Sequence, residues 1–187
     1  LRGHKGTTWE GGQRVPLIVR WPGIVPAGRE EPGIASSIDL MPTIASIVGG
    51  RMPADRGTDG LDLSGLLTGE ESESPRQSFF YYHYNAIEAV RVGDWKLHLR
   101  KREQEIQELY NLRDDPGETT NRFADQPARV ASMMELVEAM RKDLGDDATG
   151  QAGMVRPIGR VPEGRTLTSY DPDHPYYMAE YDLSDRG

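Results

Sequence analysis

Residues 3–12 have the sequence GHKGTTWEGG, which sets one lysine among glycines and threonines close to the start of the chain. Glycine lets backbone N–H groups approach an anion without a Cβ in the way. Threonine hydroxyls add further donors, and the Lys5 ammonium adds a compact, mobile charge. The pattern indicates half of an oxyanion site, and the ligand that suits it is a sulfate or phosphate ester.

Two stretches after this loop are typical of an α/β layer. Residues 14–21 hold branched apolar residues before a Pro-Gly turn, and they predict a buried strand of a mostly parallel sheet. Residues 36–48 begin with two serines suited to an N-cap, continue with apolar residues at helical spacing, and end at Gly-Gly. We expect this helix to pack on that sheet, and residues 51–78 to form a loop with one docked apolar turn.

The second half of the chain is rich in strand-forming residues. Alternating and aromatic segments predict a small antiparallel sheet with strands near 79–84, 86–92, 95–99 and 108–112. Apolar residues three and four apart predict a helix over 126–144 that covers one face of this sheet. The predicted division is 1–74 for the end of a larger α/β domain, 75–145 for the sheet and helix, and 146–187 for an extended Gly-, Pro- and Tyr-rich tail.

Residues 3–12, the stretch RVPLIVRWPG at 14–23 and the stretch SSIDLMPT at 36–43 together resemble the sulfatase family of the alkaline phosphatase superfamily. The resemblance covers residues 3–145. It implies an alkaline phosphatase-like α/β fold, in which this chain holds the C-terminal end of the large mixed sheet. The small antiparallel sheet with its packed C-terminal helix is then a second subdomain.

The resemblance also implies hydrolysis of sulfate monoesters by a formylglycine, made from Cys or Ser in a Cys/Ser-x-Pro-x-Arg motif, with a bound calcium ion. These 187 residues contain neither that motif nor the calcium ligands of the family. We therefore expect an incomplete catalytic unit that is inactive alone, with the missing N-terminal half and a sulfate ester as its partners. The sequence leaves oligomeric state and compartment open, with a periplasmic or secreted parent as one option.

Lys5 matches the family lysine that contacts the sulfate, so the resemblance makes it the catalytic and substrate-binding candidate. An ordinary surface lysine is the alternative. His4 lies beside it and is a candidate proton donor or substrate contact, with a solvent-facing loop histidine as the alternative. Thr7 is expected to order the loop, with a direct contact to the substrate as a further option.

Four other residues complete the candidate set. His83 and Asn85 lie at the end of the first strand of the small sheet, which some sulfatases bring to the rim of the cleft, so they are candidate substrate contacts. Glu10 and Arg14 are expected to form a charged pair that supports the loop. His98 alternates with two leucines, and we expect it to occupy an exposed strand position.

Composition excludes several classes of protein. The net charge of −8 argues against a nucleic-acid binder, since such surfaces need clustered lysine and arginine. The chain has no cysteine, which removes disulfides and thiolate metal sites. No apolar run reaches the ~20 residues that span a bilayer. The acidic pairs Asp114-Asp115 and Asp146-Asp147 are interpreted as solvated turns, so no metal ligand is assigned.

Two other functions stay open at this point. A phosphodiesterase or phosphonate hydrolase of the same superfamily would use Lys5 on a phosphoryl oxygen equally well. A non-catalytic binding or assembly module is the second alternative, suggested by the aromatic strand and by the tyrosines of the tail at positions 170, 176, 177 and 181.

Overall fold

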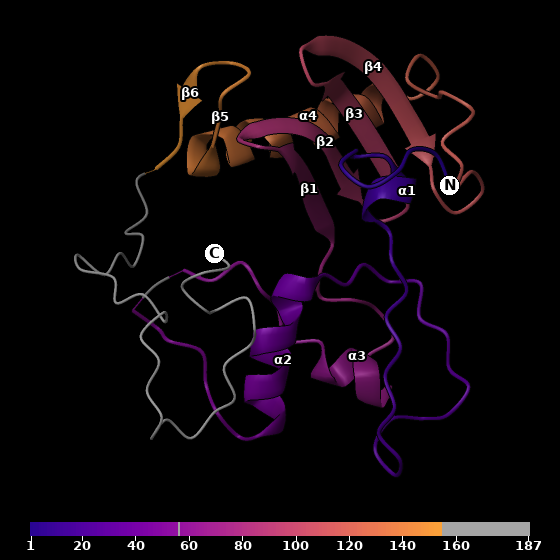
Figure 1. The fold of residues 1–187 in the computed structure, drawn as a ribbon, viewed down its shortest axis with the longest axis vertical. Coiled ribbons are helices and arrows are strands. Elements are labelled where there is room, and N and C mark those ends of the chain that lie inside the picture. Colours follow the sequence, from indigo (N-terminus) through magenta and orange to yellow (C-terminus); the bar gives the residue numbers. More distant parts are fainter. Residues whose placement is uncertain (56, 155–187) are drawn as a thin grey trace, which may run out of the picture. The chain divides into compact units, whose positions relative to one another are not determined.

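Four successive strands form an antiparallel sheet in the order β1-β2-β3-β4 (Figure 1). The computed structural model describes residues 1–55 and 57–154 of the chain. The strands are β1 (Ser78–His83), β2 (Ala86–Val92), β3 (Trp95–Lys101) and β4 (Gln104–Asn111). Gly93, at a φ of 53°, makes the tight turn between β2 and β3. The predicted small sheet is confirmed, and its last strand begins four residues earlier than expected because β3 and β4 form one long hairpin.

Helix α4 (Pro127–Leu144) covers one face of the sheet, as predicted. Proline suits the first turn of a helix because N–H groups there have no acceptor within the helix, so the lack of one costs nothing. The hydrophobic core between helix and sheet consists of Ile87, Val90, Leu97, Leu109, Met133 and Val137. Phe80 and Tyr82 of β1 pack against this cluster, so part of the aromatic strand is core.

The other face of the sheet is polar, yet it is buried. Val90 pairs with Leu97 on the core face, so Lys96 and His98, which alternate with Leu97 along β3, point away from α4. Both side chains are nevertheless 0% exposed. The prediction of an exposed His98 is wrong, because the N-terminal segment, including the short helix α1 (Glu10–Gln13), lies over this face (Figure 1).

The predicted strand over residues 14–21 does not form. This segment has no regular secondary structure, and most of its apolar side chains are exposed, with Ile18 at 88%. A strand needs a hydrogen-bonded neighbour, and the only sheets in the described residues are β1–β4 and a two-residue hairpin. The prediction of a buried strand within this chain is therefore wrong.

The predicted helix after residue 36 is confirmed, but its packing is not. A 3-10 turn (Ser37–Asp39) leads into α2 (Leu40–Ile47), and a reciprocal capping box joins Ser36 and Asp39. The apolar side chains expected against a sheet, including Met41 and Val48, are exposed instead. The loop that follows contains the expected docked turn as α3 (Ser64–Thr68), with Leu63 and Leu66 buried.

Residues 145–154, the described part of the chain after α4, differ from the extended tail that the sequence predicts. Strands β5 (Gly145–Asp146) and β6 (Gln151–Ala152) form a small hairpin. Asp146 is buried rather than solvated, because its carboxylate binds Arg141 at 2.8 Å and accepts the Ile87 N–H at 3.2 Å. The four tyrosines of the tail lie outside the described residues. The domain boundary near residue 74 stays a prediction. None of the described helices is both long and apolar enough to cross a membrane.

Candidate functional site

Lys5 lies at the tip of a tightly closed loop. The Thr7 N–H donates to the His4 carbonyl at 3.0 Å, and the Thr7 hydroxyl donates to the same oxygen at 2.7 Å. That hydroxyl also accepts the His4 N–H at 3.2 Å. At the base, the Gly11 N–H donates to the Arg2 carbonyl at 2.7 Å. The hydroxyl of Thr7 is thus engaged in ordering the turn that carries Lys5.

The glycines of this loop let the backbone close on itself. A Cβ on Gly12 would lie 2.2 Å from the Thr7 carbonyl oxygen, and one on Gly11 would lie 2.5 Å from that of Arg2. Gly3 has a φ of 79°, and a Cβ added to it would lie 2.5 Å from Thr7 Oγ1. The sequence predicts that these glycines let the backbone approach an anion. In the structure they allow the close backbone contacts that fix the shape of the loop.

Lys5 and His4 are both exposed at the tip. The His4 Nδ1 atom lies 2.9 Å from the Lys5 carbonyl oxygen, which ties the imidazole to the backbone of the turn. Neither residue lines the large groove formed by segment 14–37 or the small pocket beside the β5–β6 hairpin. The Lys5 ammonium is thus presented outward from an ordered support.

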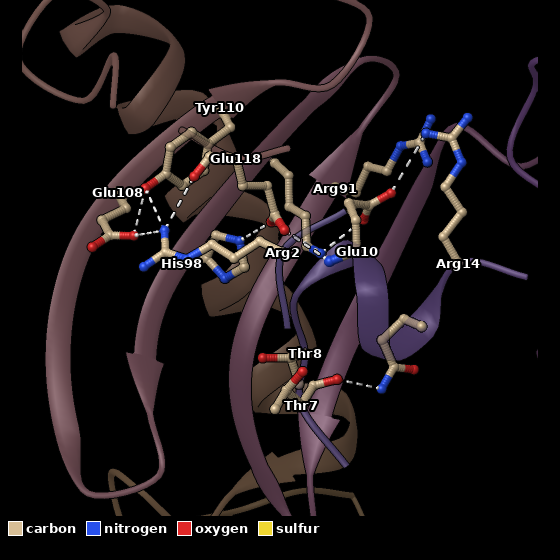
Figure 2. A network of polar contacts seen from close by, with 12 residues as sticks. Arg2, Thr7, Thr8, Glu10, Arg14, Arg91, His98, Glu108, Tyr110 and Glu118 are labelled. Atoms are coloured by element: carbon tan, nitrogen blue, oxygen red, sulfur yellow. Dashed lines mark hydrogen bonds and ion pairs between the residues drawn. The ribbon is translucent and has the colours of Figure 1, made fainter. Parts of the chain in front are cut away.

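The support is a cluster of buried charges between the loop and β3 (Figure 2). Lys96 Nζ lies 2.8 Å from Glu10 Oε1 and 3.4 Å from Glu118 Oε1. The second Glu118 oxygen accepts the backbone N–H of Glu10 at 2.8 Å. All three side chains are at most 1% exposed. The first residue of α1 is thereby fixed to the sheet at both its backbone and its side chain.

His98 extends this cluster as a neutral imidazole. Burial lowers the pKa of His98 well below its usual range, and the nearby Lys101 and Lys96 ammonium groups lower it further. The neutral ring then donates from Nε2 to Glu118 Oε1 at 2.6 Å and accepts from Lys101 at Nδ1, also at 2.6 Å. The two contacts fix one tautomer of the ring.

Lys101 and Thr8 close the other side of the cluster. Burial lowers the pKa of Lys101 to about 7, although the Glu88 carboxylate raises it in part. Lys101 donates to the Thr8 hydroxyl, which in turn donates to Glu88 at 2.5 Å. The Trp9 ring lies against His98, with 4.2 Å between ring centroids. Residues 8–10 are therefore attached to the sheet by consecutive side chains.

The predicted pair of Glu10 and Arg14 is present at 3.8 Å (Figure 2). Arg14 is half exposed, whereas Glu10 is buried, and Glu10 Oε2 accepts no hydrogen bond from the described residues. Lys96 is closer to Glu10 than Arg14 is. The structure therefore assigns most of the compensation of this carboxylate to a residue of the sheet.

His83 and Asn85 lie at the turn between β1 and β2. The Asn85 side chain donates to Asp147 at 3.1 Å, which joins this turn to the β5–β6 hairpin. The half-buried His83 ring lies edge-on to that of Tyr84, with 4.7 Å between centroids. Asn85 is thus connected to the β5–β6 hairpin, His83 packs on its neighbour, and a shared site of the two with Lys5 stays a prediction.

A calcium site does not fit the described residues. They contain no group of three or more His, Cys, Asp or Glu side chains that could hold a metal ion. Calcium takes six to eight oxygen ligands. The Asp115 carboxylate instead accepts the N–H groups of Thr119 and Thr120, and that of Asp146 is used by Arg141. No step of the chemistry is assigned to a metal on this part of the chain.

The buried cluster is what sequence reasoning missed. Lys96 lies in a strand between Trp95 and Leu97, where alternation ordinarily places a lysine in solvent. Glu118 follows the turn residues Asp115-Pro116-Gly117 and resembles any other polar loop residue. Both are buried only because the segment around Glu10, 86 residues before Lys96 and 108 before Glu118, covers them, and no local sequence pattern predicts this contact.

Comparison with known proteins shows the family of the chain. Residues 4–147 match the family described as N-sulphoglucosamine sulphohydrolase, C-terminal. The chain belongs to the sulfatase family. An arylsulfatase of Hemicentrotus pulcherrimus is 42% identical over 112 residues, which is 60% of this chain and 20% of the relative. Human arylsulfatase A is 38% identical over 169 residues, covering 75% of this chain and 32% of the relative.

A solved sulfatase from Pseudoalteromonas sp. has the same fold as this sulfatase chain. Its TM-score is 0.65 at 28% identity, covering 75% of this chain and 32% of the solved one. The expected fold class, mixed α/β of the alkaline phosphatase type, is thereby confirmed. The chain spans about a fifth of the length of the Hemicentrotus pulcherrimus relative and about a third of that of the human one.

Proposed function

We propose that this chain supplies the sulfate-binding loop of an enzyme that hydrolyses sulfate monoesters. The observation that carries the proposal is the Lys5 ammonium, exposed at the tip of a loop whose base is fixed to the sheet by buried charges. Preorganised donors stabilise charge that develops on a substrate because they need no reorganisation during the reaction. A rigid support for one cation meets that requirement.

The role of Lys5 in this proposal is electrostatic. Its ammonium binds a sulfuryl oxygen and stabilises the negative charge that shifts as the S–O bond breaks. His4, on the same turn, is proposed as a second contact with the substrate, while Thr7 acts through the loop geometry. His83 and Asn85 remain candidates for the far rim of the site. The alcohol part of the ester is not specified by these residues.

The nucleophile and the calcium ion are proposed to come from an N-terminal region that precedes this part in the complete enzyme. The two relatives named above are about five and three times as long as the matched part, which leaves room for such a region. Exposed apolar side chains at Val15, Ile18, Met41 and Val48 support its docking on segment 14–21 and α2.

The experiment is a comparison of lysine variants in the complete enzyme with a nitrophenyl sulfate substrate. Lys5→Ala should lower kcat by ~100-fold, the effect typical of losing one preorganised donor to a developing anion. Lys142→Ala, which removes an exposed lysine of α4, serves as the matched control and should leave kcat unchanged. A Lys5→Ala enzyme as active as the control contradicts the proposal.

The same assay separates the alternative within the superfamily. A nitrophenyl phosphate diester, tested beside the sulfate ester, should be the poorer substrate by kcat/KM. A preference for the diester that is lost in Lys5→Ala would assign the loop to a phosphodiesterase or phosphonate hydrolase instead.

A further inference from the structure

Glu118 contacts the two stems of the Lys5 loop at once. Its carboxylate accepts the backbone N–H of Glu10 at 2.8 Å, on the stem that follows Lys5. Its carbonyl oxygen accepts a guanidinium N–H of Arg2 at 3.1 Å, on the stem that precedes Lys5. One residue, more than a hundred positions away in the sequence, thus holds both ends of the segment that presents the ammonium.

The backbone around Glu118 is itself fixed. Its φ of 53° is unusual for a residue with a side chain, and its N–H donates to the Asp115 carbonyl at 3.1 Å. The Asp115 carboxylate accepts the N–H groups of the next two residues, Thr119 and Thr120. The turn therefore holds Glu118 in a strained conformation that aims its carboxylate at the loop.

The carboxylate is also fixed from the side of the sheet. Glu118 Oε1 accepts from His98 at 2.6 Å and lies 3.4 Å from the Lys96 ammonium. These two side chains come from β3, whose opposite face, at Leu97, packs in the core. Glu118 thus connects β3 to the loop. This connection lies on the face of the sheet opposite the core and α4.

We propose that Glu118 is a positioning residue, which sets the place of the Lys5 ammonium by clamping both stems of its loop to the sheet. The inference rests on the proposed function of Lys5. Glu118 itself contacts no reacting atom in this scheme, so its effect on the reaction passes through Lys5.

A double-mutant cycle in the complete enzyme tests this dependence. Glu118→Gln keeps the size of the side chain but places an amide NH₂ among the donors of Glu10, His98 and Lys96. It should lower kcat/KM for nitrophenyl sulfate by roughly 10- to 100-fold, since small misplacements of a catalytic group have effects of that order. In the Lys5→Ala background the same substitution should change kcat/KM by less than ~2-fold, because the group it positions is gone.

Loss of fold stability is separated by a core variant. Val137→Ala removes two buried methyl groups of α4 on the opposite face of the sheet. It should lower the melting temperature and leave kcat/KM unchanged well below that temperature. Equal losses of kcat/KM in Val137→Ala and Glu118→Gln, at equal losses of melting temperature, overturn the inference.

Arg2→Met provides the test from the other stem if Glu118→Gln does not fold. Its side chain is 41% exposed, so the substitution disturbs the core little. It should also lower kcat/KM and also lose its effect in the Lys5→Ala background. If kcat/KM of a double variant with Lys5→Ala falls by the product of the two single effects, the positioning role is overturned and the proposed function of Lys5 still stands. A fully active Lys5→Ala enzyme overturns the proposed function, and the positioning role with it.

Discussion

Replacing Lys96 by methionine is the sharpest test of the buried cluster. The ammonium is 0% exposed, lies 2.8 Å from Glu10 and 3.4 Å from Glu118, and stands 4.1 Å above the ring of Tyr81. Methionine fills a similar volume, so the cavity left behind is small. What the substitution removes is the charge that compensates two buried carboxylates.

The magnitude follows from the burial of the partners. Removing one member of a buried ion pair costs about 3–5 kcal/mol, because the opposite charge stays in the interior without compensation. Lys96 has two such partners, each at most 1% exposed, so we expect a loss of about 4 kcal/mol or more in the free energy of unfolding. That is a large fraction of the 5–15 kcal/mol typical of a folded protein.

Urea unfolding followed by tryptophan fluorescence measures this loss. With a slope of about 2 kcal/mol per molar urea, the midpoint should fall by roughly 2 M. Lys142→Met, at an exposed lysine of α4, should shift the midpoint by less than ~0.3 M. Adding Glu10→Gln to Lys96→Met should restore part of the loss, because it removes one of the uncompensated charges. If the Lys96→Met midpoint shifts no more than the control, Lys96 is not the charge that compensates Glu10 and Glu118, and the reasoning is refuted.

Three further outcomes are expected. Because burial lowers the folded-state pKa of Lys101 to about 7 from its ordinary 10.5, the unfolded chain binds more protons between these values, and stability should rise with pH from 7 to about 10. Lys101→Met should remove that rise, by up to roughly 1.4 kcal/mol per pH unit in urea titrations. Gly12→Ala should destabilise the loop more than Gly6→Ala, since a Cβ meets backbone at 2.2 Å at the first position, whereas at the second it has open space and only the strain of a φ of 87° to overcome; proteolysis of residues 1–14 reports the difference. Met133→Ala, at 2% exposure, should cost about 2–5 kcal/mol and Leu136→Ala, at 39%, much less, measured by thermal unfolding.

Sequence patterns were sufficient for the elements whose partners lie nearby in the chain. The hairpins of β1–β4 and helix α4 need only neighbouring segments, so period-two and period-3.6 patterns place them within a few residues. Residues 14–21 have an equally clear strand pattern, but a pattern cannot supply a pairing strand, and the described residues hold none for it. The same limit applies to α2, whose apolar side chains Met41 and Ile44, with Val48 at its end, are exposed in the described part of the chain.

The burial of His98 shows a second limit of local patterns. Alternation correctly places it on the face of β3 opposite Leu97, but alternation cannot tell water from a covering segment. Thr8, Trp9 and Glu10 form that cover, and each has a polar or aromatic partner on the sheet. These three residues belong to the sequence stretch 3–12 that identifies the loop, and they also attach the loop to the sheet.

The chemistry of this attachment explains why charges occupy a place that apolar side chains could fill. Apolar contacts are non-directional, so an apolar cover would tolerate small shifts of the loop across the sheet. The Glu10 N–H, the His98 ring and the Lys96 ammonium instead meet one carboxylate along defined directions. A shift of the loop would leave at least one of them buried without a partner, at about 1–3 kcal/mol for each lost contact. That penalty holds the Lys5 turn in one position, and a single ammonium needs such a position to serve as a preorganised donor.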